Sequence, residues 1–180
     1  MKIVLSDIRR YQAYERRSAI FHFLTQRSLW AIFQYRVANS IYNSKLPGLI
    51  RKPLLIIVSI WRIIIEITTG ISIPHSCIIG KGLYIGHPGN IIFNANARLG
   101  DYCNVSQGVT VGVSGRRGDR GVPIIGNYVY MAANSVIVGK IVVGDRVVVG
   151  ANSVVTRNVE PDTTVMGVPA VKISNQNSLD

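Results

Sequence analysis

The sequence contains little cysteine, little histidine and few acidic residues. Two cysteines in 180 residues, with no CxxC pair, exclude a disulfide framework and a cysteine-based zinc motif. The three histidines, none of them after His87, do not suit a three-histidine zinc centre, and we expect no bound metal. Nine acidic residues against 20 basic ones give a net charge of +11, which predicts affinity for phosphates, anionic lipids or acidic polymers.

Long apolar runs are also missing. The amino-terminal residues include Lys2, Arg9 and Arg10 and form no apolar signal core, so we expect no secretion. The most apolar stretch, 54–65, is interrupted by Arg62 and is shorter than the about 20 residues that span a bilayer. We therefore expect a cytoplasmic protein. No nucleic-acid-binding motif accompanies the positive charge, so we expect no nucleic-acid partner.

A spacing of six residues is the dominant pattern. Neither a helix nor an alternating strand produces this period, whereas one face of a parallel β-helix does. We expect glycines such as Gly126 and Gly144, which follow aliphatic positions, to supply turn angles that other residues resist. Cys77 and Cys103 fall on small inward positions, so we interpret them as buried side chains and not as reactive thiols. The aliphatic series is unbroken at Ile125, Met131, Ile137, Val143, Val149 and Val155.

The spacing of six is interrupted twice. The step from Ile85 to Phe93 is eight residues long and contains His87-Pro88-Gly89-Asn90. The second interruption, 113–123, is a basic, glycine-rich segment. Because a regular solenoid tends to carry its function on such interruptions, both segments are candidate functional sites.

The N-terminal segment differs in character from the repeats. Residues 5–44 are predicted to form helices, Pro47-Gly48 breaks them, and residues 46–67 form an apolar helix. This helix is interpreted as a cover for the open end of the β-helix or as an oligomer interface. The alternative is an interfacial helix on the inner face of a membrane, anchored by basic residues and Trp61. We divide the chain into a basic helical segment, 1–70, a β-helix, 71–173, and a polar tail, 174–180.

The repeats, the Gly86–Gly89 segment, the loop before Ile125 and the closing Gly167-Val168-Pro169-Ala170 resemble the left-handed β-helix acyltransferases. The chain is most similar to their serine O-acetyltransferase branch, and especially to relatives that acetylate sugars. The resemblance implies a left-handed β-helix, a homotrimer, and acetyl-CoA in the groove between neighbouring subunits. A γ-type carbonic anhydrase shares this fold but requires zinc-binding histidines in later coils, which this chain lacks.

The family's catalytic histidine falls on His87, which the resemblance makes the general base for direct attack of an acceptor hydroxyl on acetyl-CoA. Arg116 and Arg117 are candidate ligands of the CoA phosphates. The other positions implied for the CoA arm are small residues or turns: Gly112, Ala133, Gly139, Gly167 and Pro169. Candidate acceptor contacts are Tyr84, Asn104, Gln107, Asp119 and Arg120.

Three departures from the serine acetyltransferase pattern bear on the acceptor. An aspartate before the catalytic histidine is replaced by Gly86, an aspartate near the first hexapeptide by Ser72, and a second histidine in the loop by Gly121 or Val122. The groups that would hold the charged ends of free serine are thus mostly absent. We therefore predict a hydroxyl of a sugar or polysaccharide, of capsule or O-antigen type, as the acceptor. Two alternatives stay open: serine, as in cysteine biosynthesis, and a non-catalytic trimeric scaffold.

Overall fold

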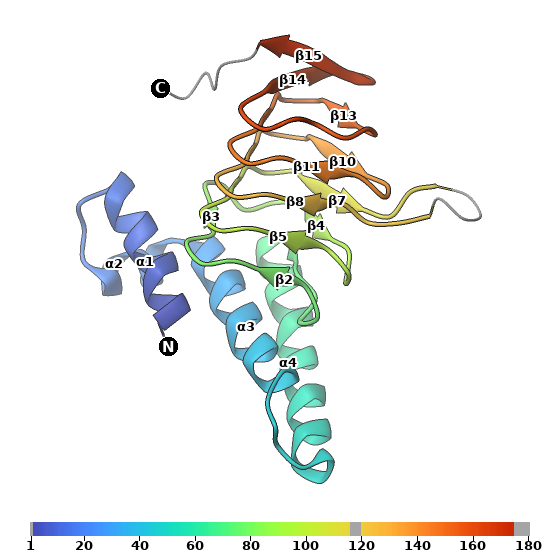
Figure 1. Ribbon diagram of the computed structural model, residues 1–180. Coiled ribbons are helices and arrows are strands. Elements are labelled where there is room, and N and C mark those ends of the chain that lie inside the picture. The colour runs from blue at the N-terminus through green and yellow to red at the C-terminus, as the bar shows by residue number, and fades with distance from the viewer. Residues whose placement is uncertain (1, 116–119, 175–180) are drawn as a thin grey trace.

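The computed structural model describes residues 2–115 and 120–174, in which four helices precede a three-sided parallel β-helix (Figure 1). The helices are α1 (Lys2–Tyr14), α2 (Ala19–Thr25), α3 (Arg27–Tyr42) and α4 (Gly48–Thr69). Pro47 is the N-cap of α4, and Gly70 ends that helix with a left-handed φ of 67°. The predicted helical segment and its break at Pro47-Gly48 are confirmed. The predicted polar tail falls almost entirely on 175–180, outside the described residues.

The strands stack into three sheets, which we call faces A, B and C. Face A contains β1 (Ile71–Ser72), β4 (Ile91–Phe93), β7 (Thr110–Gly112), β10 (Val136–Val138) and β13 (Val154–Val155). Face B contains β2 (Ile78–Ile79), β5 (Arg98–Leu99), β8 (Ile124–Ile125) and β11 (Val142–Val143). Face C contains β3 (Tyr84–Ile85), β6 (Asn104–Val105), β9 (Tyr130–Met131), β12 (Val148–Val149), β14 (Thr164–Gly167) and β15 (Ala170–Ser174). Only β15 among these strands is antiparallel to its neighbour.

The spacing of six sets which side chains fill the interior. A regular coil pairs Ile137 with Val155, three sixes further along the chain. The coil from Ile85 to Val105 is two residues longer, and the excess lies in the corner that contains His87. All thirteen register positions are buried: Ile73, Ile79, Ile85, Phe93, Leu99, Val105, Val111, Ile125, Met131, Ile137, Val143, Val149 and Val155. The predicted register and both interruptions are confirmed.

Glycines after the aliphatic positions serve a different purpose from the predicted one. Neither Gly126 nor Gly144 has a left-handed φ. A Cβ on Gly126 would lie 2.4 Å from Asp145 Oδ1, and one on Gly144 would lie 2.5 Å from the Pro161 nitrogen. The expectation of special turn angles is therefore wrong at these two positions. Glycine is needed because the next coil packs directly against its Cα, which lets Asp145 accept a 2.7 Å hydrogen bond from the Asn127 N–H.

The two cysteines are interior side chains. Cys77 and Cys103 are free thiols with no exposed surface, and burial raises the pKa of each to about 12. The thiolate, which is the nucleophilic form, is scarce at neutral pH. Their interpretation as structural residues is confirmed.

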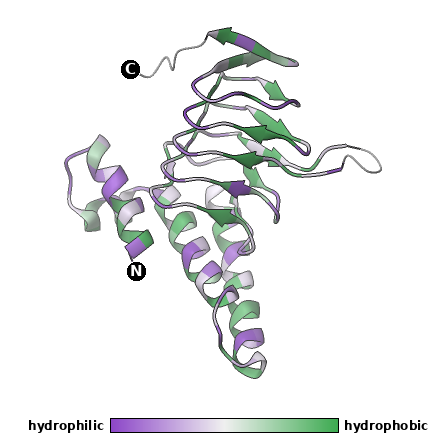
Figure 2. Ribbon diagram, in the orientation of Figure 1, coloured by the Kyte–Doolittle hydropathy of each residue, from purple (hydrophilic) through white to green (hydrophobic). Residues whose placement is uncertain are grey.

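Helix α4 is apolar along most of its length (Figure 2). It packs against α3, where the Gln34 side chain donates a 3.0 Å hydrogen bond to the Val58 carbonyl oxygen. Within 2–115 and 120–174, no helix combines the length and the apolar character needed to cross a bilayer.

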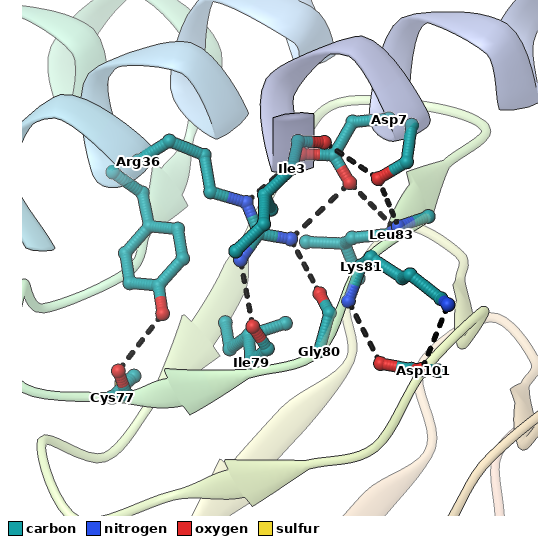
Figure 3. Close-up of polar contacts among 12 residues, drawn as sticks. Ile3, Asp7, Arg36, Cys77, Ile79, Gly80, Lys81, Leu83 and Asp101 are labelled. Atoms are coloured by element: carbon teal, nitrogen blue, oxygen red, sulfur yellow. Dashed lines mark hydrogen bonds and ion pairs between the residues drawn. The ribbon is translucent and has the colours of Figure 1, made fainter. Parts of the chain in front are cut away.

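A buried ion pair attaches the helices to the first coil (Figure 3). Arg36 of α3 donates from Nε to Asp7 of α1 at 2.9 Å and from Nη1 to the Ile79 carbonyl oxygen at 2.7 Å. Asp7 also accepts a 2.9 Å hydrogen bond from the Leu83 N–H. Burial raises the pKa of Asp7, although the hydrogen bond and charge of Arg36 oppose that shift. The network fixes α1 beside β3, the strand that leads to His87.

Candidate active site

His87 lies on the corner between faces C and A, directly after β3. The corner is widened by Gly89, with a φ of 125°, and by Asn90, with a φ of 50°. Glycine suits the first of these angles because other residues rarely adopt it. The Gly89 carbonyl oxygen accepts a 2.8 Å hydrogen bond from the Gly108 N–H of the next coil. The widened corner therefore stays joined to the solenoid and presents an exposed His87 side chain.

A pocket of about 240 Å³ lies beside His87. Tyr84 and Asn104, both predicted acceptor contacts, occupy paired outward positions on β3 and β6 and line this pocket. The structure thus brings the candidate base together with two predicted binding residues. The full lining consists of Tyr14, Tyr84, Gly86, His87, Asn104, Val105, Ser106 and Tyr130.

Helix α1 supplies a wall of this pocket that sequence reasoning missed. The Tyr14 ring stacks on Tyr84 with 4.3 Å between centroids, and its hydroxyl accepts a 3.2 Å hydrogen bond from Asn104 Nδ2. Arg10 donates to Asn104 Oδ1 at 3.3 Å. No local motif marks Arg10 or Tyr14, because their role depends on where α1 docks. Tyr130 could have been found, since it pairs with Asn104 in the next coil of face C.

Tyr84 and Tyr11 remain protonated at neutral pH. Burial, and then the neighbouring Tyr14, raise the pKa of Tyr84. Burial also raises the pKa of Tyr11, whose hydroxyl donates to the Ile85 carbonyl oxygen at 2.9 Å. Among the described residues, no ion pair includes His87. The pocket therefore offers neutral hydroxyl and amide groups. The nearby charged group is Arg10, which donates a hydrogen bond to Asn104.

Two further predicted residues share the edge of the solenoid that carries His87. Successive corners on this edge are joined by hydrogen bonds: the Asn134 N–H donates to the Gln107 carbonyl oxygen, and the Asn152 N–H to the Ala133 carbonyl oxygen, each at 2.9 Å. Gln107 and Ala133 therefore lie one and two coils beyond His87 along this edge.

The remaining predicted residues lie elsewhere. Gly112 and Gly139 are on the edge between faces A and B, and Gly167 and Pro169 belong to the turn between β14 and β15. Arg116, Arg117 and Asp119 lie outside the described residues.

Arg120 lines a second depression, of about 480 Å³, together with Arg98, Asn94 and Asn96. The loop base is closed by backbone hydrogen bonds between Ser114 and Gly121. This depression is on the edge between faces A and B, whereas His87 is on the edge between C and A. Within one chain, Arg120 is therefore separated from the His87 pocket. Arg98 was missed because its outward position on β5 carries no motif.

No family model matches the chain. It is 33% identical over 139 residues to the serine acetyltransferase of Synechococcus elongatus, covering 77% of this chain and 54% of that protein. It is 33% identical over 153 residues to the serine acetyltransferase of Staphylococcus aureus strain Mu50, covering 85% of this chain and 68% of that one. The crystal structure of Neisseria gonorrhoeae serine acetyltransferase matches with a TM-score of 0.84 and 27% identity, covering 99% of this chain and 67% of that one. The chain thus spans about half the length of the Synechococcus relative.

The three-sided solenoid and its structural match define a member of the hexapeptide-repeat, left-handed β-helix acyltransferase superfamily. The predicted fold class is confirmed, with the hand inferred from the resemblance. Within that superfamily the chain belongs to the serine acetyltransferase family. These relatives give no support to the finer resemblance to sugar-acetylating proteins.

Proposed function

We propose that this chain is an O-acetyltransferase that uses acetyl-CoA, with His87 as its general base. The observation that carries the proposal is an exposed histidine on a widened corner, beside a pocket lined by hydroxyl and amide groups. The relatives are named serine acetyltransferases, so the hydroxyl of free serine is the first acceptor to test. The comparisons favour this alternative over the saccharide.

The reaction requires a proton transfer that His87 is placed to perform. Acetyl-CoA supplies an activated thioester. His87 accepts the proton of the acceptor hydroxyl while the acceptor oxygen bonds to the acetyl carbon. As the carbon–sulfur bond breaks, the imidazolium returns this proton to the leaving sulfur. Because the acceptor oxygen attacks the acetyl carbon directly, no acyl-enzyme forms. A positioned base of this kind typically contributes about 10² to 10⁴ in rate.

The chain offers suitable groups for CoA on two edges. Gly112, Gly139 and Ala133 present small residues at these edges, while Arg98 and Arg120 provide positive charge for phosphates. A homotrimer would place the Arg120 edge of one subunit against the His87 edge of its neighbour. The separation of the two depressions within one chain supports this assembly, because each site would then draw residues from two subunits.

A saccharide hydroxyl is the second candidate acceptor. Gly86 offers no carboxylate for the ammonium group of serine, and Tyr14 and Tyr84 form an aromatic wall of the pocket. Aromatic faces and neutral hydrogen-bonding groups suit a ring that carries several hydroxyls. Support for a saccharide acceptor comes from the site residues alone and not from the relatives.

An acceptor screen tests the proposal. Release of the CoA thiol would be measured for the full chain with serine, nucleotide sugars and capsular or O-antigen oligosaccharides. His87→Ala should lower turnover with the true acceptor by about 10² or more, whereas the control His75→Ala should retain it. Equal turnover by wild type and His87→Ala would contradict the proposed role of His87. Turnover of serine alone would exclude the saccharide.

A further inference from the structure

No residue within 2–115 and 120–174 covers one face of α4. Val58, Ile65 and Thr69 on the opposite face are buried, toward α3 and the first coil. The uncovered face consists of aliphatic residues that are each more than half exposed: Leu49, Ile50, Ile56, Ile57, Ile60, Ile63, Ile64 and Ile67. We call this set the α4 stripe. Its ends are the most exposed, at 88% for Leu49 and 80% for Ile67.

The α4 stripe is continuous along the helix. From Ile56 to Ile67 its members recur three or four residues apart, and Leu49 and Ile50 precede Ile56 and Ile57 by seven residues, or about two helical turns. Both spacings place residues on one side of an α-helix. From Leu49 to Ile67 the stripe runs about 27 Å at the helical rise of 1.5 Å per residue. A contiguous aliphatic surface of this length is typical of an interaction site, because soluble monomers rarely leave such patches in water.

The predicted role of α4 as a cover for the open end of the β-helix is filled mainly by α3. Tyr35 of α3 donates to the Cys77 carbonyl oxygen at 2.8 Å, and Asn39 donates to the His75 carbonyl oxygen at 2.7 Å. Helix α4 reaches β1 through its C-terminal end, while the rest projects away from the solenoid beside α3 (Figure 1). Its apolar character is therefore not explained by covering the first coil.

Charge distinguishes between the occupants that could cover the α4 stripe. Residues 1–70 carry eleven basic and three acidic side chains. Of those acids, Asp7 is buried with Arg36, and Glu66 lies 3.6 Å from Arg62. Arg51 and Lys52, near the start of α4, take part in no ion pair of the described residues. Anionic lipids would be attracted to this segment, whereas a second copy would bring two strongly basic surfaces together.

We propose that α4 docks on an anionic membrane surface, with the α4 stripe in the boundary between headgroups and acyl chains. Arg51 and Lys52 contact the headgroups. An amphipathic helix of this kind lies in the interface and does not cross the bilayer. The half-buried Trp61 packs on Phe33 with 6.1 Å between ring centroids, so it is not a member of the α4 stripe, and its predicted role as an anchor stays a prediction. The proposal does not depend on the acetyl-transfer activity.

Vesicle co-sedimentation of the full chain tests this surface. Wild type should bind vesicles of phosphatidylglycerol and phosphatidylcholine, and should bind pure phosphatidylcholine far less. Ile60→Gln with Ile67→Gln should weaken binding about tenfold or more, because two aliphatic side chains no longer enter the lipid. Arg51→Gln with Lys52→Gln should reduce both the affinity and its dependence on salt.

The matched control is Ile20→Gln with Leu24→Gln on α2, whose side chains are 74% and 70% exposed. This control should bind as wild type does, and all variants should keep the wild-type helical circular dichroism. No wild-type binding to the anionic vesicles, or an equal loss in the α2 control, would overturn the proposal. A lower oligomer mass of Ile60→Gln with Ile67→Gln in lipid-free solution would assign the α4 stripe to a second copy and would also overturn it.

Discussion

Gly86 directly precedes the candidate base His87, and the backbone conformation at this position does not require glycine. Its φ is not in the left-handed region, and the heavy atom nearest to an added Cβ is Tyr84 Cε1 at 3.4 Å. An ordinary van der Waals contact of this kind leaves space for a side chain. The missing carboxylate is therefore a chemical property of the site and not a consequence of its turn.

Gly86→Asp should raise kcat/KM for serine about tenfold. The new carboxylate can form a charge-assisted hydrogen bond with the acceptor ammonium group, and a neutral saccharide hydroxyl gains nothing comparable. Gly86→Asn is the matched control, since it has nearly the same size without the charge. Steady-state kinetics with both acceptors would be compared, and equal effects of Asp and Asn would contradict an electrostatic role.

Cys77 and Cys103 should resist alkylation in the folded protein. Burial raises the pKa of each thiol from an ordinary 9.0 to about 12, so at pH 8 the folded chain has about a thousandfold fewer thiolates than the unfolded chain. Iodoacetamide labelling with and without denaturant checks this difference.

The same shift predicts that the free energy of unfolding falls at high pH. Since the folded pKa is the higher one, the contribution of the two thiols to stability is complete below about pH 9 and is lost as the pH rises toward about 12. Urea titrations at pH 8 and pH 10.5 check this loss.

At the scale of elements, a buried ion pair helps to position α1, together with the Tyr11 hydroxyl, which donates to the Ile85 carbonyl oxygen. The Asp7 and Arg36 side chains are 1% and 6% exposed, and each also bonds to the backbone of the first coil. The same helix carries Arg10 and Tyr14 to the His87 pocket. A packing contact near the N-terminus thus determines the shape of a site more than 70 residues further along the chain.

Arg36→Met should destabilise the fold by about 3–5 kcal/mol, because it leaves Asp7 buried without its counter-charge. The exposed pair of Arg146 with Asp162 provides a control, and Arg146→Met should change the melting temperature little. Thermal unfolding followed by circular dichroism measures both. A loss as small for Arg36→Met as for Arg146→Met would show that the ion pair does not hold α1.

At the scale of the whole molecule, the candidate base and the arginines proposed to bind CoA phosphates lie on two different edges of the solenoid. His87 and Arg120 border separate depressions in one chain. The proposed trimer would unite them between neighbours, so the assembly is expected to be necessary for activity.

Co-expression of His87→Ala with Arg120→Ala tests this arrangement. Each variant alone should be weakly active at low acetyl-CoA. Random mixing in a trimer should restore about a quarter of the wild-type activity, because that share of interfaces combines an intact His87 with a neighbouring intact Arg120. A mixed preparation no more active than the two variants apart would show that each chain forms its site alone.

The sequence by itself determined the coils of this protein. With a period of six, each aliphatic residue in the register from Ile73 to Val155 points inward whatever its distant neighbours are, and a change of period at His87 marks a corner. The register, the interruptions and the buried cysteines could therefore be predicted from local spacing. The close-packing role of Gly126 could not, because it depends on the coil above.

Only the tertiary structure decided how the helices meet the coils. The docking of α1 depends on contacts between residues far apart in the sequence, such as Asp7 with Leu83, and no local pattern specifies them. The separation of Arg120 from His87 follows from which corner each interruption occupies. Whether α4 is covered was likewise open, since an apolar helix has the same sequence pattern whether protein or lipid faces it.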